Sequence, residues 1–241
     1  MAKPAEHPPA GVFDRLADRN MRWTELRRRL VSFAAPGRPA AATVLHPYIA
    51  LSRQAGAGGE SLARRLGAAL GWPVFDQELL DFLSEQCSLD RESLELLDET
   101  RVSWFDESVL SLVRAHFISQ DEYVARLIKI VVLALMERSA VLVGRGAQAA
   151  LPRERGLAVR AVADEPDRVQ RIQELKRLGP RDARRWVAET DAARRDFVRR
   201  HFHVDLTDPL GYDITVNTSR LGLDGAAAVV LAAARARGLI A

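Results

Sequence analysis

Short runs of apolar residues alternate along this chain with longer segments in which apolar residues recur at helical spacing. The runs lie at 48–51, 141–143, 157–163 and 214–216, and a shorter extended piece lies at 72–75. A strand that is apolar at nearly every position is buried on both faces, which is typical of a parallel sheet with helices on each side. The pattern therefore predicts an α/β fold in which strands and helices alternate.

The helical segments differ in how clearly their periodicity marks a buried face. The strongest pattern covers 121–138, with apolar residues at Val124, Leu127, Ile128, Val131, Val132 and Leu135. Other helices are predicted at 61–70, 77–86, 165–177, 181–201 and 223–237, and polar helices within 88–120. Glycine and proline at 71 and 179–180 suit the ends of three of them.

The first 42 residues differ in character from the rest. Residues 1–11 are rich in proline and lack periodicity, which predicts disorder, whereas 12–34 follow the pattern of a basic amphipathic helix. We interpret 1–42 as an N-terminal extension and 43–241 as the main domain. The helix would pack on the domain or on a partner, including a second copy of the chain. Binding to a membrane surface or to nucleic acid is the alternative that we do not favour.

Composition narrows the class of protein without naming one. The 241 residues are 48% hydrophobic and 28% charged with a net charge of +3, which suits a globular domain and gives no argument for nucleic-acid binding. Almost all the positive charge is arginine, because the only lysines are Lys3, Lys129 and Lys176. The single cysteine, Cys87, and the absence of an apolar signal or membrane segment predict a cytoplasmic protein without membrane contact.

The segment 52–61 carries the clearest chemical signal. It has the sequence Ser-Arg-Gln-Ala-Gly-Ala-Gly-Gly-Glu-Ser and stands between a predicted strand and a predicted helix. Glycines allow consecutive backbone N–H groups to turn toward an anion, and the helix N-terminus adds positive potential. The context therefore predicts a phosphate-binding loop, with a plain tight turn as the alternative.

The loop and three later segments together resemble the cytidylate kinase-like family, a branch of the nucleoside-monophosphate kinases within the P-loop fold. Ser52-Arg53-Gln54 followed by Gly56-Ala57-Gly58-Gly59 is similar to the opening signature of that family. The later segments are Gly71 to Asp76, Val141 to Gly146 and Tyr212 to Ser219, in the expected order. The resemblance runs from Tyr48 to the C-terminus. It implies a three-layer P-loop kinase fold with a central parallel sheet, a helical acceptor-binding insertion and an arginine-rich lid.

The resemblance implies an activity and a set of site residues. The activity is ATP-dependent, Mg²⁺-dependent phosphoryl transfer to a nucleoside monophosphate, with CMP or dCMP favoured. The donor nucleotide would be bound by Ser52, Arg53, Gln54, Gly56, Ala57, Gly58, Gly59, Glu60 and Ser61, with Ser61 as the metal ligand. The catalytic arginines would be Arg145, Arg194, Arg195 and Arg199, and the acceptor would be bound by Asp76, Arg145, Arg168 and Arg171. Such charge neutralisation is what phosphoryl transfer requires of a protein.

The chain also departs from the family pattern. Gly59 stands where related kinases have the loop lysine, Gly146 replaces an aspartate, and Asp81 and Phe82 replace a Tyr-Arg pair. Arg53, Arg145, a lid arginine or Lys176 could replace the lysine. These departures leave two alternatives open: a nucleotide-binding regulator with weak or no catalysis, and a kinase that acts on a small metabolite other than a nucleotide.

Three further features have ordinary explanations beside functional ones. His201, His203 and Asp205 have the spacing of metal ligands but also suit a polar connection. Cys87 has no surrounding motif and is expected to be unreactive. Trp104-Phe105 would line an acceptor pocket or simply pack between helices.

Overall fold

The computed structural model describes residue 24, residues 45–76, residue 79 and residues 122–241. Apart from Thr24 and Leu79, the residues of the predicted helices at 12–34, 77–86 and 88–120, including Cys87 and the pair Trp104-Phe105, lie outside the described residues. The division into an extension and a domain therefore stays a prediction.

Five strands among the described residues form one parallel sheet in the order β2-β3-β1-β4-β5. The strands are β1 (Tyr48–Arg53), β2 (Val74–Phe75), β3 (Ala140–Val143), β4 (Gly156–Val162) and β5 (Ile214–Asn217). Every residue of β1 and β3 is buried. The predicted α/β fold with a central parallel sheet is confirmed, and the strands begin or end within two residues of the expected positions.

The helices follow the sequence periodicity closely. They are α2 (Gly59–Leu70), α6 (Glu122–Glu137), α7 (Ala147–Ala150), α8 (Glu165–Lys176), α9 (Pro180–Phe202) and α10 (Thr218–Ala236), with 3-10 turns at Arg153–Arg155 and Pro209–Gly211. The sequence did not predict the one-turn helix α7. The closing helix α10 starts five residues earlier than predicted and is kinked at Gly222, which adopts non-helical dihedral angles. No helix in the described part of the chain has the length and apolar character needed to cross a bilayer.

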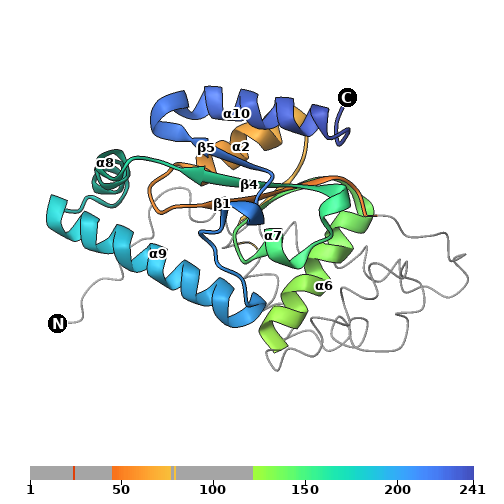
Figure 1. Cartoon of the computed structure of the whole chain (residues 1–241), viewed down its shortest axis with the longest axis horizontal. Helices are drawn as coiled ribbons and strands as arrows, with labels where there is room; N and C mark the ends of the chain where they lie inside the picture. The colour runs from red at the N-terminus through yellow and green to blue at the C-terminus, as the bar shows by residue number, and fades with distance from the viewer. Residues whose placement is uncertain (1–23, 25–44, 77–78, 80–121) are drawn as a thin grey trace, which may run out of the picture.

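Helices cover both faces of the sheet and form two cores (Figure 1). On one face, Leu62 and Leu66 of α2 and Val230 of α10 pack against Ile49 and Val159 of the sheet. On the other face, α6 and α7 pack on the sheet, and Phe197 and Phe202 of α9 contact the same core. The three-layer arrangement follows from strands that are apolar on both faces.

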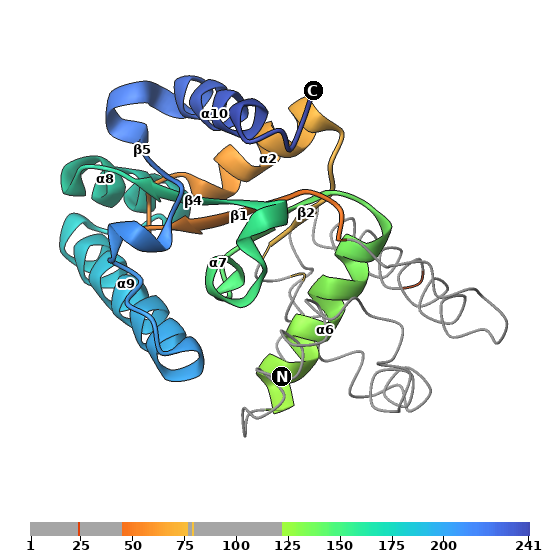
Figure 2. The same cartoon turned by 45° about the vertical axis from the view of Figure 1, so that its right-hand side comes forward.

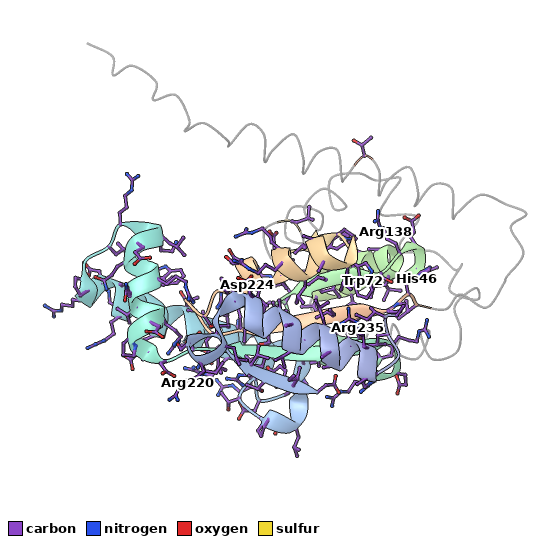
Figure 3. All side chains as sticks on the ribbon, turned by 90° about the horizontal axis from the view of Figure 1, so that it is seen from above. His46, Trp72, Arg138, Arg220, Asp224 and Arg235 are labelled. Atoms are coloured by element: carbon purple, nitrogen blue, oxygen red, sulfur yellow. The ribbon has the colours of Figure 1, made fainter. Side chains whose placement is uncertain are left out.

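The amino ends and carboxyl ends of the strands lie at opposite edges of the sheet. His46, Trp72 and Arg138, which precede β1, β2 and β3, lie together at one edge (Figure 3). At the other edge the strand arrows point toward α8 and α9 (Figure 1). The order of the strands changes direction at β1, whose neighbours are β3 and β4. In open α/β sheets ligands bind outside the carboxyl ends at such a point, and here that point is the end of β1.

Candidate functional site

The glycine-rich loop joins β1 to α2 at the carboxyl edge, where the sequence predicted it. Gly56 and Gly58 have φ values of 76° and 74°, in the left-handed region that favours glycine. A Cβ atom on Gly56 would collide with the backbone carbonyl of Arg168, so α8 packs directly on the loop. The glycines are therefore required both by the turn and by the close approach of another element.

Side chains from three distant helices hold the loop carbonyls. Arg168 Nη1 donates to Ala55 O at 3.3 Å, Arg171 Nη1 to Gly56 O at 2.6 Å and Thr218 Oγ1 to Ala57 O at 2.9 Å. Arg194 Nη1 from α9 donates to Arg53 O at 3.2 Å, at the end of β1. With the carbonyls occupied in this way, the loop conformation is fixed by contacts from α8, α9 and α10.

The backbone N–H groups of the loop are left available. Within the described residues no protein acceptor faces the N–H groups of Gly56, Gly58, Gly59, Glu60 and Ser61. The last three belong to the first turn of α2, whose N–H groups have no partner inside the helix. A set of free N–H groups at a helix N-terminus favours an anion, and phosphate is the anion that such loops bind.

Three arginines, Arg53, Arg145 and Arg194, lie near one another at this edge of the sheet. The side chain of Arg53 is 7% exposed, and its Nε atom has no hydrogen-bond partner among the described residues. Burial, followed by the charges of Arg194 and Arg145, lowers the pKa of Arg53 to about 10. Burial also lowers the pKa of Arg194, and Arg145 acts in the same direction. Neighbouring cations repel one another, and a bound polyanion would offset this repulsion.

Arg145 reaches the site from the end of β3 in a strained conformation. Its φ is 51° and the glycines on either side are at 81° and 74°. Its guanidinium lies 5.0 Å from the ring centre of Phe197 and 5.8 Å from that of Tyr123, within cation–π range. The aromatic rings thus hold Arg145 between α6 and α9 while leaving its charge near Arg53 and Arg194. A non-glycine residue with positive φ at such a place often serves a site.

Asp191 of α9 joins this helix to the glycine-rich loop, and no sequence motif pointed to it. Its carboxylate accepts from Ala55 N at 2.7 Å and from Arg168 Nη1 at 2.5 Å, and the two side chains are 14% and 12% exposed. Arg168, which the family resemblance assigned to the acceptor, is thus engaged by Asp191 and the loop carbonyl. Thr218 lies within the predicted family segment Tyr212 to Ser219, but the sequence does not identify it as a contact of the loop.

The other predicted arginines are not brought together with this cluster. Arg195 is exposed, and Arg199, 77% exposed, pairs with Asp196 of its own helix at 2.8 Å. Lys176 lies over the ring of Trp186 at 4.6 Å. On α9, Arg194 is therefore the predicted arginine that the fold directs at the loop (Figure 2 shows α9 below the end of β4).

Three further predicted residues, Ser52, Gln54 and Asp76, make hydrogen bonds within the protein. Ser52 is buried, with Oγ 3.2 Å from the Tyr212 hydroxyl, and Gln54 Oε1 accepts from Ala163 N at 3.1 Å. Both therefore fix the strand ends. Asp76 Oδ1 accepts from Leu79 N at 2.9 Å, which is the geometry of a helix cap. Its role in binding an acceptor stays a prediction.

Ser61 is the residue at this site that is suited to bind a metal ion. Its hydroxyl is half-buried in the first turn of α2 and accepts from Arg64 Nη2 at a long 3.4 Å. The described residues hold no group of three His, Cys, Asp or Glu side chains able to bind a metal, and this includes His201, His203 and Asp205. Mg²⁺ is commonly held by few protein ligands together with the phosphates of a nucleotide, and a single hydroxyl beside a phosphate loop suits that arrangement.

The fold and this edge of the sheet define the class: an α/β protein of the P-loop type, with a glycine-rich loop at the end of β1. The sequence model of the cytidylate kinase-like family matches residues 48–220, so the chain belongs to the cytidylate kinase-like family. No curated protein sequence matches the chain significantly.

Solved structures also match. An uncharacterized protein from Eubacterium ventriosum is 20% identical over 79% of this chain and 99% of its own, with a TM-score of 0.64. This likeness confirms the fold. A shikimate kinase from Acinetobacter baumannii, solved with shikimate, is 17% identical over 84% of this chain and 100% of its own, with a TM-score of 0.41.

Proposed function

We propose that this protein is a kinase that transfers a phosphoryl group from Mg-ATP to a nucleoside monophosphate, with CMP or dCMP as the favoured acceptor. Membership of the cytidylate kinase-like family supports phosphotransferase activity and ATP as the donor. The acceptor class rests on the family resemblance alone.

The observation that carries the proposal is the joint presence of free loop N–H groups and three arginines. The N–H groups of 58–61 would bind the donor phosphates, and Arg53, Arg145 and Arg194 would neutralise the charge on them. Phosphoryl transfer depends mainly on positioning and charge neutralisation, so a strong base is not required. Mg²⁺, when bound with the nucleotide, would supply further neutralisation beside Ser61.

The structure also explains one departure from the family pattern. A Cβ atom on Gly146 would collide with the ring of Phe202, at the end of α9. The aspartate of related kinases therefore has no room here, and any metal contact it would make has to come from elsewhere in the site. Glycine at 146 thus fits the packing of Phe202 at the end of α9.

The test is ADP formation from Mg-ATP by the full chain with CMP, dCMP, UMP, AMP or GMP, and without acceptor. ADP formed with one monophosphate and not without it is the expected result. Arg194→Ala should reduce this rate by about 100-fold or more, since removal of a charge-stabilising donor commonly costs that much. Arg185→Ala is the matched control, because Arg185 is an exposed arginine of the same helix that pairs with Asp182.

The other outcomes point to different functions. ATP binding without turnover for any monophosphate would overturn the nucleoside-monophosphate kinase and favour a regulator or a different acceptor. Equal loss of activity in Arg194→Ala and Arg185→Ala would show that Arg194 has no special role at the loop.

A further inference from the structure

Gly59 has no backbone reason to be glycine. Its φ is not positive, unlike those of Gly56 and Gly58, and it is the first residue of α2. What excludes a side chain there is space, because a Cβ atom on Gly59 would lie 2.6 Å from both Cβ and Cγ of Arg53. The stem of Arg53 therefore passes over the position from which a side chain at 59 would start.

Positions 53 and 59 have the spacing of a known sequence motif, but its glycine and its cation are interchanged. The phosphate loop of P-loop proteins reads Gly-x-x-x-x-Gly-Lys, in which the lysine reaches the outer phosphates. With Gly58 as the second glycine of that pattern, position 53 corresponds to the first glycine and position 59 to the lysine. This chain has Arg53 at the first and Gly59 at the second. Where the pattern has a glycine the chain has the cation, and where it has the cation the chain has glycine.

The head group of Arg53 reaches across to the neighbouring strand. A Cβ atom on Gly144, at the end of β3, would collide with Arg53 Nη1. The guanidinium thus stands at the carboxyl edge of the sheet, between the phosphate loop and the segment that bears Arg145. Among the described residues its ion-pair partner is Glu60, whose Oε1 lies 3.9 Å from Nη2 and whose side chain is 60% exposed.

The positive charge of Arg53 is poorly neutralised by the described residues. Only 7% of its side-chain surface is exposed, and its Nε atom has no hydrogen-bond partner among the described residues. Arg194 donates to its carbonyl, and both Arg194 and Arg145 add positive charge nearby. A buried cation among cations requires an anion, and the free N–H groups beside it favour a polyphosphate.

We infer that Arg53 and Gly59 are an exchanged pair: the cation that P-loop kinases place at the start of the helix is supplied here from the end of β1, and glycine at 59 leaves room for it. The guanidinium would contact the outer phosphates of the donor. This inference rests on the proposed function for the identity of the ligand, but the exclusion of one side chain by the other does not depend on it.

The shared space is tested by thermal unfolding of the full chain without ligand. Gly59→Ala and Gly59→Lys should each lower Tm by about 5 °C in the wild-type background, because a second side chain overpacks the site. In an Arg53→Gly background the same two changes should leave Tm unchanged or raise it, since alanine and lysine favour helix over glycine. An equal loss of Tm in both backgrounds would overturn the exchanged pair.

The phosphate contact is tested by calorimetric titration with inorganic triphosphate and Mg²⁺. Arg53→Gly should weaken binding by about 10-fold or more, and Arg53→Gly/Gly59→Lys should regain most of that loss. Arg65→Ala is the charge control, because Arg65 lies on α2 and pairs with Asp224 at 2.6 Å; it should bind as the wild type does. Undiminished binding by Arg53→Gly would overturn the contact, and no recovery in the double variant would overturn the exchange of the two positions.

Failure of the proposed function would look different. A wild-type protein that binds no triphosphate would refute both the ATP-dependent kinase and the phosphate contact. A wild type that binds triphosphate, with no recovery in the double variant, would refute only the exchanged pair.

Discussion

Asp191→Ala tests whether α9 and the glycine-rich loop form one structural unit. The change removes the acceptor of two donors, Ala55 N at 2.7 Å and Arg168 Nη1 at 2.5 Å. Arg168 would retain Ala55 O at 3.3 Å, and its Nε already has no partner among the described residues. The variant therefore leaves a largely buried guanidinium without its carboxylate.

The size of the effect follows from the burial of the pair. Breaking a fully buried ion pair by removing one partner costs about 3–5 kcal/mol. Because the two side chains keep 12% and 14% exposure, we expect the lower end, about 3 kcal/mol. For a chain of this size that corresponds to a fall in Tm of roughly 6–12 °C.

Asp196→Ala is the matched control. Asp196 lies on the same helix and pairs with Arg199 at 2.8 Å, but the side chains are 55% and 77% exposed. Such surface pairs contribute about 0.3–0.5 kcal/mol. The gain in helix propensity on changing aspartate to alanine is common to both variants, so the difference between them isolates the buried pair.

The assay is urea and thermal unfolding of the wild type and both variants, followed by circular dichroism. If Asp191→Ala unfolds within about 1 kcal/mol of Asp196→Ala, the contact does not stabilise the loop as argued. A loss confined to Asp191→Ala would support an α9 helix that is fastened to the loop by this buried pair.

Two further predictions concern single residues of the fold. Gly146→Asp should destabilise the protein by about 2 kcal/mol more than Gly71→Asp. Both residues have a left-handed φ, but only Gly146 faces the ring of Phe202. Denaturant unfolding measures the difference in the free energy of unfolding, and equal losses would contradict the steric argument. Tyr48→Phe should cost about 1 kcal/mol at pH 7, because it removes a buried hydroxyl that donates to a backbone carbonyl at 2.6 Å. Burial raises the pKa of Tyr48, so the folded tyrosine stays protonated while the unfolded one ionises above about pH 10. The wild type should therefore lose stability above pH 10 faster than Tyr48→Phe, and parallel curves at pH 8 to 11 would refute this.

The elements of this fold could be predicted from the sequence because their information is local. Apolar runs such as 48–51 and 141–143 indicated strands buried on both faces, and the sheet has them at its centre. Gly56 and Gly58 indicated the turn after β1, and both adopt the left-handed conformation that only glycine takes readily. The position of the candidate site followed from these two signals, since carboxyl ends of parallel strands share one edge.

Tertiary packing, and not the local sequence, decided which residues come together at the candidate site. Along α9 the sequence offers several arginines with similar neighbours, and nothing local separates Arg194 from Arg195 or Arg199. Their difference arises because α9 packs on α8 through small residues such as Ala183 and Val187, and this sets which face meets the loop. Periodicity shows which residues share a face of a helix; it does not show what that face contacts.

The residues that the sequence missed, or assigned differently, join segments far apart in the chain. Asp191 meets Ala55 across 136 positions, and Thr218 meets Ala57 across 161. The absence of a loop lysine was visible in the sequence, which left several replacements open. That Arg53 fills the space over Gly59 was visible only in three dimensions, because the collision of two side chains depends on the turn between them. Local propensity and burial pattern thus determined the sheet, the loop and the helices, whereas the packing of α8, α9 and α10 against the end of β1 determined which charges meet there.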